Sequence, residues 1–181
     1  MKAFSNMIVV AGAGRHVGKT TFICELISHF SSLYEVTGIK ISPHFHQLSH
    51  KNELICHSDH FIIRKELDTE SGKDSSRMLK AGAHKVFYIE AADKHVSGAM
   101  DAIMSEIGSN PVICESAALR RLIIPGIFIF IENNPVTGQD KNPDLKEKAD
   151  LIMHTFKNSF NFNYRDISFD GQRWKLLRTK G

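Results

Sequence analysis

The segment VVAGAGRHVGKTTF, residues 9–22, constrains the fold of this chain more than any other part of the sequence. It begins within a short apolar run rich in β-branched residues, at 6–12, which ends in glycine and is typical of a buried strand. From Phe22 to Leu33, apolar residues recur at intervals of three and four, which is typical of one face of a helix. The segment therefore predicts a buried strand, a glycine-rich turn and an amphipathic helix in succession.

The turn has the spacing of a phosphate-binding loop, Gly-x-x-x-x-Gly-Lys-Ser/Thr, with alanine in place of the first glycine. In such a loop the backbone N–H groups and the positive end of the helix dipole face a phosphate. The lysine then reaches the terminal phosphates, and the hydroxyl that follows it binds Mg²⁺. We therefore predict a site for a magnesium–nucleoside triphosphate. The residues expected to form it are Ala13, Gly14, Arg15, His16, Val17, Gly18, Lys19, Thr20 and Thr21.

Strands and helices alternate along the rest of the chain until a final hairpin. The apolar runs predict strands at 35–41, 60–67, 85–91, 111–116 and 126–133, the second of them at a sheet edge. Helical periodicity and capping residues predict helices at 75–83, 93–107 and 142–156. Asp170-Gly171 between two alternating runs predicts a hairpin. This order predicts an α/β fold: a three-layer, doubly wound, mostly parallel sheet like that of P-loop nucleoside triphosphatases, with a C-terminal antiparallel hairpin.

Length and composition are those of one globular domain, 1–181. The net charge of +3 is small and no long run of like charges occurs, which does not favour nucleic-acid binding. Three cysteines, an odd count, indicate reduced thiols rather than a disulfide framework. The N-terminal segment 1–14 has too short an apolar run for a signal peptide or a membrane span. We expect a cytoplasmic protein that binds neither nucleic acid nor membranes.

A phosphate-binding loop needs an acidic residue at the end of a neighbouring strand to hold the magnesium ion. Glu115 ends one of the buried apolar runs, and we expect it to act with Lys19 in catalysis and with Thr20 in metal binding. Glu90 and Glu132 also end apolar runs, and for these two we favour solvated strand ends.

A second stretch that combines glycine with basic residues, TESGKDSSR at 69–77, opens a predicted helix. Either Asp74 or Ser75 is expected to cap that helix. The basic residues beside the helix N-terminus favour a second anion pocket, whereas capping with solvated lysine and arginine is the alternative. The residues expected to frame the helix N-terminus in such a pocket are Lys73 and Arg77.

These stretches together resemble the molybdopterin-guanine dinucleotide biosynthesis adaptor family, MobB. The resemblance is carried by VTGIKISPHFH, SGKDSSRMLKAGA and the strand that ends at Glu115, in that order after the loop, and it spans residues 6–132. It implies a GTP-binding homodimer with weak GTPase activity that assists the guanylyltransferase acting on molybdopterin. It also implies that Gly14, Gly18, Lys19, Thr20 and Thr21 bind GTP, that Lys40, Lys73, Asp74, Ser75 and Arg77 line the facing pocket, and that Glu115 serves the Mg²⁺.

The sequence departs from the family in several respects, one of which is a longer stretch at 44–60. The loop has Arg15, His16 and Val17 where the family has small residues, and SAALRRL follows Glu115 in place of the family's Glu-Gly-x-Lys. No Asn/Thr-Lys-x-Asp motif for guanine recognition is present, so ATP remains an alternative nucleotide.

Other function classes remain open. RHVGKTTF with Lys40 also resembles dethiobiotin synthetase, an ATP-dependent ligase, although the Gly-Ala-Gly-Gly-like loop of that class is missing here. Histidines gather between His44 and His60 with Cys56 and Asp59, which is a ligand set for Zn²⁺ or Ni²⁺ and makes a GTP-driven metal-delivery factor an alternative. The spacing matches no standard four-ligand pattern, and clustered histidines in a polar loop are more often solvated or hydrogen-bonded. A nucleotide-controlled switch is a third alternative. We identify no group that activates a nucleophile, which favours a slow adaptor with weak triphosphatase activity at most.

Overall fold

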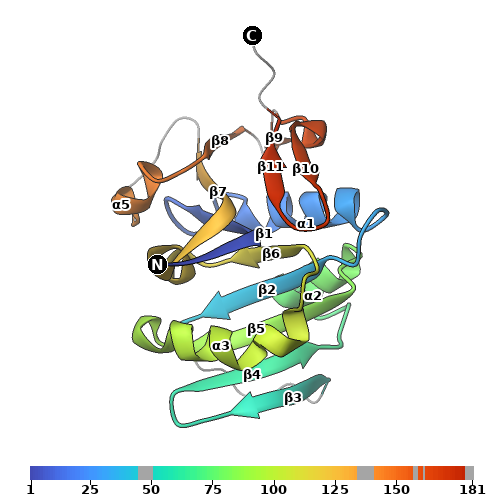
Figure 1. The fold of residues 1–181 in the computed structure, drawn as a ribbon, viewed down its shortest axis with the longest axis vertical. Coiled ribbons are helices and arrows are strands. Elements are labelled where there is room, and N and C mark those ends of the chain that lie inside the picture. Colours follow the sequence, from blue (N-terminus) through green and yellow to red (C-terminus); the bar gives the residue numbers. More distant parts are fainter. Residues whose placement is uncertain (45–50, 134–140, 157–158, 161, 178–181) are drawn as a thin grey trace.

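The computed structural model describes residues 1–44, 51–133, 141–156, 159–160 and 162–177. Within them nine strands form one mixed sheet, in the order β3-β4-β5-β2-β6-β1-β7-β8-β9 (Figure 1). These strands are β1 (Lys2–Gly12), β2 (Thr37–Ser42), β3 (Asn52–His57), β4 (Phe61–Glu66), β5 (Lys85–Ala91), β6 (Val112–Glu115), β7 (Ile123–Asn133), β8 (Leu151–Phe156) and β9 (Ser159–Phe160).

The middle of the sheet is parallel. Strand β1 pairs in parallel with β6 and β7, β2 with β5 and β6, and β7 with β8. Among the described strands of this sheet, antiparallel pairing occurs only toward the edges, in β3-β4-β5 and in β8-β9. The predicted α/β class with a mostly parallel sheet is confirmed. The carboxyl ends of β1, β2 and β6 lie together, which brings loops from distant parts of the chain to one edge.

Helices cover both faces of the sheet, as a buried parallel sheet requires. The helices are α1 (Lys19–Phe30), α2 (Asp74–Lys80), α3 (Val96–Ile107), α4 (Ala117–Leu122) and α5 (Pro143–Lys146), with 3₁₀ turns η1 (Asp93–His95) and η2 (Tyr164–Asp166). Apolar residues of α1 and α2 pack on one face, and those of α3, α4 and α5 pack on the other (Figure 1). None of the described helices is long and apolar enough to cross a membrane.

The C-terminal hairpin is confirmed. It consists of β10 (Ile167–Phe169) and β11 (Trp174–Leu176), which pair antiparallel around Gly171 at φ 92°. The hairpin packs beside α1, where the Trp174 ring lies 4.8 Å from Phe30 and its Nε1 donates to the Asn6 carbonyl at 2.9 Å. Ile167, Phe169 and Trp174 therefore join the same hydrophobic cluster as the buried residues of α1.

Two predictions about the elements are wrong, one about the type of a segment and one about the position of a strand in the sheet. The segment 142–156 is not one helix: α5 ends at Lys146, and 151–156 forms strand β8 beside β7. The helical spacing of its apolar residues is overridden by Asp150, whose backbone N–H and carboxylate both bond to Phe128 of β7. Strand β4 is not an edge strand either, because β3 pairs with its outer side.

Candidate functional site

The loop 13–18 joins β1 to α1, and its backbone conformation depends on two glycines. A Cβ atom at Gly12 would lie 2.6 Å from the Ile131 carbonyl oxygen, so no larger residue fits there. Gly18 precedes α1 at φ 89°, in the left-handed region that glycine adopts most readily. His16 also has a positive φ of 60°, which is uncommon for a residue with a side chain. The path of the turn therefore depends on backbone conformations that glycine adopts more readily than other residues.

The loop leaves a series of backbone donors without partners. In the described part of the chain, no hydrogen bond is formed by the backbone N–H groups of residues 14–18. The first turn of α1 adds further N–H groups that have no partner within the helix. By contrast, Ala13 donates to Ile131 at 3.0 Å and accepts from Lys141 at 2.8 Å, so it anchors the loop. Free N–H groups at a helix N-terminus are a site for an anion.

The Lys19 side chain folds over this loop. Its ammonium donates to the Gly14 carbonyl at 2.5 Å. Burial lowers the pKa of Lys19, against the opposing influence of the Glu115 carboxylate. Lys19, Gly18, Arg15 and His16 all line a cavity of about 650 Å³ above the loop, whereas the Val17 side chain is buried in the core.

Beside the loop, one lysine and one hydroxyl meet two carboxylates. Lys40, on β2, places its Nζ 2.8 Å from Asp74 Oδ2 and 2.7 Å from Glu115 Oε1. The Thr20 hydroxyl oxygen lies 2.9 Å from Asp74 Oδ1 and 3.2 Å from Glu115 Oε2. A hydroxyl and carboxylates are oxygen ligands of the kind that Mg²⁺ prefers. The sequence therefore anticipated Thr20 and Glu115 as neighbours, and Asp74 joins them.

The charged groups in this cluster shift one another's pKa values. Burial alone would lower the pKa of Lys40, but the Glu115 and Asp74 carboxylates outweigh it and raise that pKa. Burial alone would raise the pKa of Asp74, but Lys40, together with the Thr20 hydroxyl, lowers it. Both groups therefore stay charged around neutral pH, and the Lys40 ammonium offsets one of the two negative charges that would otherwise repel a phosphate.

The residues predicted for the second anion pocket divide between two cavities. Arg77 lies on the phosphate-loop side, where its Nη2 donates to the Thr21 hydroxyl at 3.2 Å. Lys73 and Ser75 line a different cavity of about 470 Å³, which also includes Lys40 and Asp74. Ser75 is buried and donates to Glu66 at 2.6 Å, so its hydroxyl is already engaged. Neither Asp74 nor Ser75 caps α2, since Lys73 is the N-cap residue and makes no capping side-chain bond.

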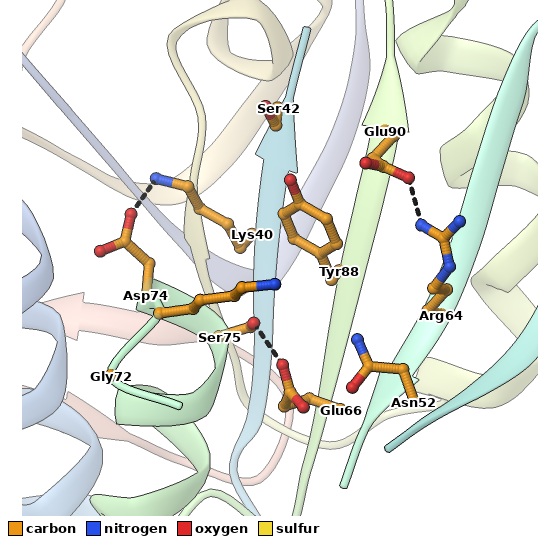
Figure 2. Close-up of a pocket in the computed structure, with 11 residues that line it drawn as sticks. Lys40, Ser42, Asn52, Arg64, Glu66, Gly72, Asp74, Ser75, Tyr88 and Glu90 are labelled. Carbon is orange, nitrogen blue, oxygen red and sulfur yellow. Dashed lines mark hydrogen bonds and ion pairs between the residues drawn. The ribbon is translucent and has the colours of Figure 1, made fainter. Parts of the chain in front are cut away.

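Arg64 and Tyr88, which were not predicted from sequence, form the floor of the 470 Å³ cavity. Lys40 pairs in register with Tyr88 of β5, and Tyr88 pairs with Arg64 of β4. Cross-strand partners point to the same face of a sheet, so the three side chains form one row. Figure 2 shows the Tyr88 ring between Lys40 and Arg64, with Asn52 and Glu66 completing the wall.

The prediction of solvated strand ends at Glu90 and Glu132 is wrong. Glu90 is 0% exposed and pairs with the buried Arg64 guanidinium. Glu132 is 3% exposed and lies 2.7 Å from Lys146 Nζ. Each carboxylate is tolerated inside the protein because a cation neutralises it. The sequence carried no sign of either partner, since both lie on other elements.

The histidine-rich segment 44–60 lies only partly within the described residues, because 45–50, with His46 and His50, falls outside them. In the part of the chain that the structure describes, no three histidine, cysteine, aspartate or glutamate side chains lie close enough to hold a metal ion. His60 instead stacks on His95, with ring centroids 4.2 Å apart.

Comparisons with known protein families, with curated proteins and with solved structures found no match to this chain.

Proposed function

We propose that the chain binds a magnesium–nucleoside triphosphate, with its phosphates on the loop 13–21 and its Mg²⁺ beside Thr20 and Glu115. One observation carries this proposal: the N–H groups of residues 14–18 make no hydrogen bond to any described residue, and they lead directly into the N-terminus of α1. Lys19 supplies the side-chain cation for the terminal phosphates once it leaves the Gly14 carbonyl.

Slow turnover is the expected activity. Glu115 and Asp74 are both held in ion pairs with Lys40, so neither is positioned to take a proton from an attacking water. We therefore propose a weak triphosphatase whose nucleotide controls the conformation of the loop. The preference for GTP, a homodimer and a role beside the guanylyltransferase of molybdopterin metabolism rest on the MobB resemblance alone, and they are part of the same proposal.

The ligase is the second candidate, and the 470 Å³ cavity favours it. A ligase needs room for an acceptor beside the terminal phosphate, and this cavity shares Lys40 and Asp74 with the cavity of the phosphate loop. If the chain is a ligase of this class, its nucleotide is ATP rather than GTP. The metal-delivery factor has no comparable support from the described residues.

Calorimetric titration with GTP and with ATP, each with and without Mg²⁺, tests the proposal. We expect one nucleotide to bind with a magnesium-dependent affinity, and Lys19→Met to weaken that binding by about 10- to 100-fold. Lys80→Met serves as the matched control, because Lys80 is exposed at the far end of α2 and pairs only with Glu70 among the described residues. Equal affinities in the two variants would remove the site. Repeating the titration after adding Zn²⁺ or Ni²⁺ tests the metal-delivery alternative.

A further inference from the structure

The 470 Å³ cavity is built as a binding site in its own right. Its volume is in the range of small-molecule pockets, roughly 300–1,000 Å³. It is bounded by side chains from β2, β3, β4 and β5 and by the chain that enters α2. The phosphate-loop cavity adjoins it through Lys40 and Asp74, which line both. A molecule in this cavity would therefore lie next to the terminal phosphate of a nucleotide.

The buried carboxylates in the wall of the cavity already have hydrogen-bond or ion-pair partners. Glu66, 2% exposed, accepts from the Ser75 hydroxyl at 2.6 Å and from the backbone N–H groups of Leu67 and Asp68 at 3.1 and 3.0 Å. Glu90 is fully buried against Arg64. Asp74, the third acid in the lining, pairs with Lys40 at 2.8 Å. Because each of the three acids has an ion-pair or hydrogen-bond partner, the cavity does not favour a cationic ligand.

The charge that remains available to a ligand is positive, and it lies at the end of the cavity that Lys40 and Lys73 form. Lys73 is exposed at the rim and forms no ion pair with any described residue. Lys40 uses two of its three protons on Asp74 and Glu115. If Mg²⁺ took those two carboxylates, the Lys40 ammonium would lose both partners and would be free to bind an anion in the cavity. Deeper inside, the buried Arg64 Nε has no partner among the described residues, and an acceptor atom would satisfy it.

The floor of the cavity is aromatic. The Tyr88 ring is half-buried and stands in the row between Lys40 and Arg64 (Figure 2). Its hydroxyl is directed to Ser42, so the ring itself is the surface that a ligand meets. Aromatic faces favour planar ligands that stack on them.

We propose that this cavity binds a small organic anion with a planar ring, whose carboxylate or phosphate lies between Lys40 and Lys73 and whose ring lies against Tyr88. The proposal deepens the proposed function and rests on it in one respect: the anion binds more tightly when Mg²⁺ and nucleotide have freed Lys40. The anion site itself does not require the nucleotide.

Four probes test this site on the full chain: benzoate, phenyl phosphate, cyclohexanecarboxylate and benzamide. Each is titrated by ¹H–¹⁵N NMR, with and without Mg²⁺ and a non-hydrolysable triphosphate analogue that fills the loop. We expect benzoate or phenyl phosphate to saturate with a Kd of about 1–10 mM, and whichever is tighter identifies carboxylate or phosphate. The non-planar acid and the neutral amide should bind at least about fivefold more weakly.

Three variants locate the binding. Lys73→Met should weaken both anions by at least about fivefold, whereas the control Lys80→Met on the same helix should not. Tyr88→Leu should remove the preference for benzoate over cyclohexanecarboxylate. Asn52→Trp, which fills the cavity from the edge strand, should abolish the binding of all probes.

The outcomes separate the two proposals. If neither aromatic anion saturates by about 50 mM, or if Lys73→Met and Lys80→Met bind them equally, the cavity is not an anion site. If the anions bind but the nucleotide does not, the proposed function fails and the second site stands. Binding that is unchanged by Mg²⁺ and nucleotide overturns the role given to Lys40.

Discussion

Lys40→Met is the most informative perturbation of this structure, because it removes one cation from between two carboxylates. The Lys40 side chain is 18% exposed and that of Glu115 is 6% exposed, and their charged atoms are 2.7 Å apart. Removing one partner of a buried ion pair costs about 3–5 kcal/mol. The Asp74 side chain is 39% exposed, so solvent screens part of its charge, and we expect a loss of about 2–3 kcal/mol. In a chain of this size that lowers the Tm by roughly 5–10 °C.

The assay is thermal unfolding in EDTA and in excess Mg²⁺, without nucleotide. Magnesium should restore much of the lost stability to Lys40→Met, because it neutralises Asp74 and Glu115 in place of the ammonium. Lys175→Met is the matched control: Lys175 also lies 2.8 Å from a carboxylate, but both side chains of that pair are well exposed. We expect a smaller Tm change there, without magnesium rescue. The double variant Lys40→Met/Glu115→Gln should recover part of the loss.

The pH dependence gives an independent check. The lowered pKa of Asp74 means that its contribution is present above the ordinary value of 3.8 and is lost as the pH falls through its folded-state pKa. The raised pKa of Lys40 means that its contribution is present below 10.5 and is lost as the pH rises through its folded-state pKa. The stability difference between wild type and Lys40→Met should therefore be flat between about pH 5 and 9. A Tm loss no larger than that of Lys175→Met, or no response to magnesium, would refute this reasoning.

Three further perturbations test separate parts of the structure. Lys19→Met should weaken triphosphate binding by about 10- to 100-fold, as the loss of a hydrogen bond to a charged group implies, and calorimetry measures it. Gly12→Ala should cost about 1–3 kcal/mol in urea unfolding, because its Cβ would lie 2.6 Å from a β7 carbonyl oxygen, whereas Gly14→Ala meets no atom within 4 Å; equal midpoints would contradict this. Iodoacetamide at about pH 8 should label Cys56 before Cys24, since burial raises the pKa of Cys24 to about 11, and peptide mass spectrometry reads the order.

The sequence predicted those parts of the fold in which local pattern and tertiary context agree. Buried apolar runs became the parallel strands, and Asp170-Gly171 became a hairpin turn. The pattern at 142–156 failed because Leu151–Phe156 gains more from pairing with β7 than from continuing a helix. Helical periodicity in a short segment does not distinguish these outcomes, since the partner strand lies elsewhere in the chain.

The residues of the candidate site also fall into those that the sequence could predict and those that it could not. Thr20 and Glu115 were predictable as neighbours, because the carboxyl ends of parallel strands meet at one edge. Arg64 and Tyr88 were not predictable, because their meeting depends on the register of the antiparallel strand β4 against β5. A shift of one residue would turn Arg64 to the opposite face, and the sequence does not specify that register.

The register also fixes how far the two proposed ligands lie from each other. Glu115, Lys40, Tyr88 and Arg64 are successive partners across β6, β2, β5 and β4. Neighbouring strands are about 4.8 Å apart, so the ring at Tyr88 lies roughly 10 Å from the carboxylate at Glu115. An anion extending from that ring toward Lys40 spans most of this distance and comes within reach of the terminal phosphate. If the chain is a ligase, ³²P from the terminal phosphate should pass to the anion; if it is an adaptor, the label should appear only as inorganic phosphate, at a rate that the anion changes through Lys40.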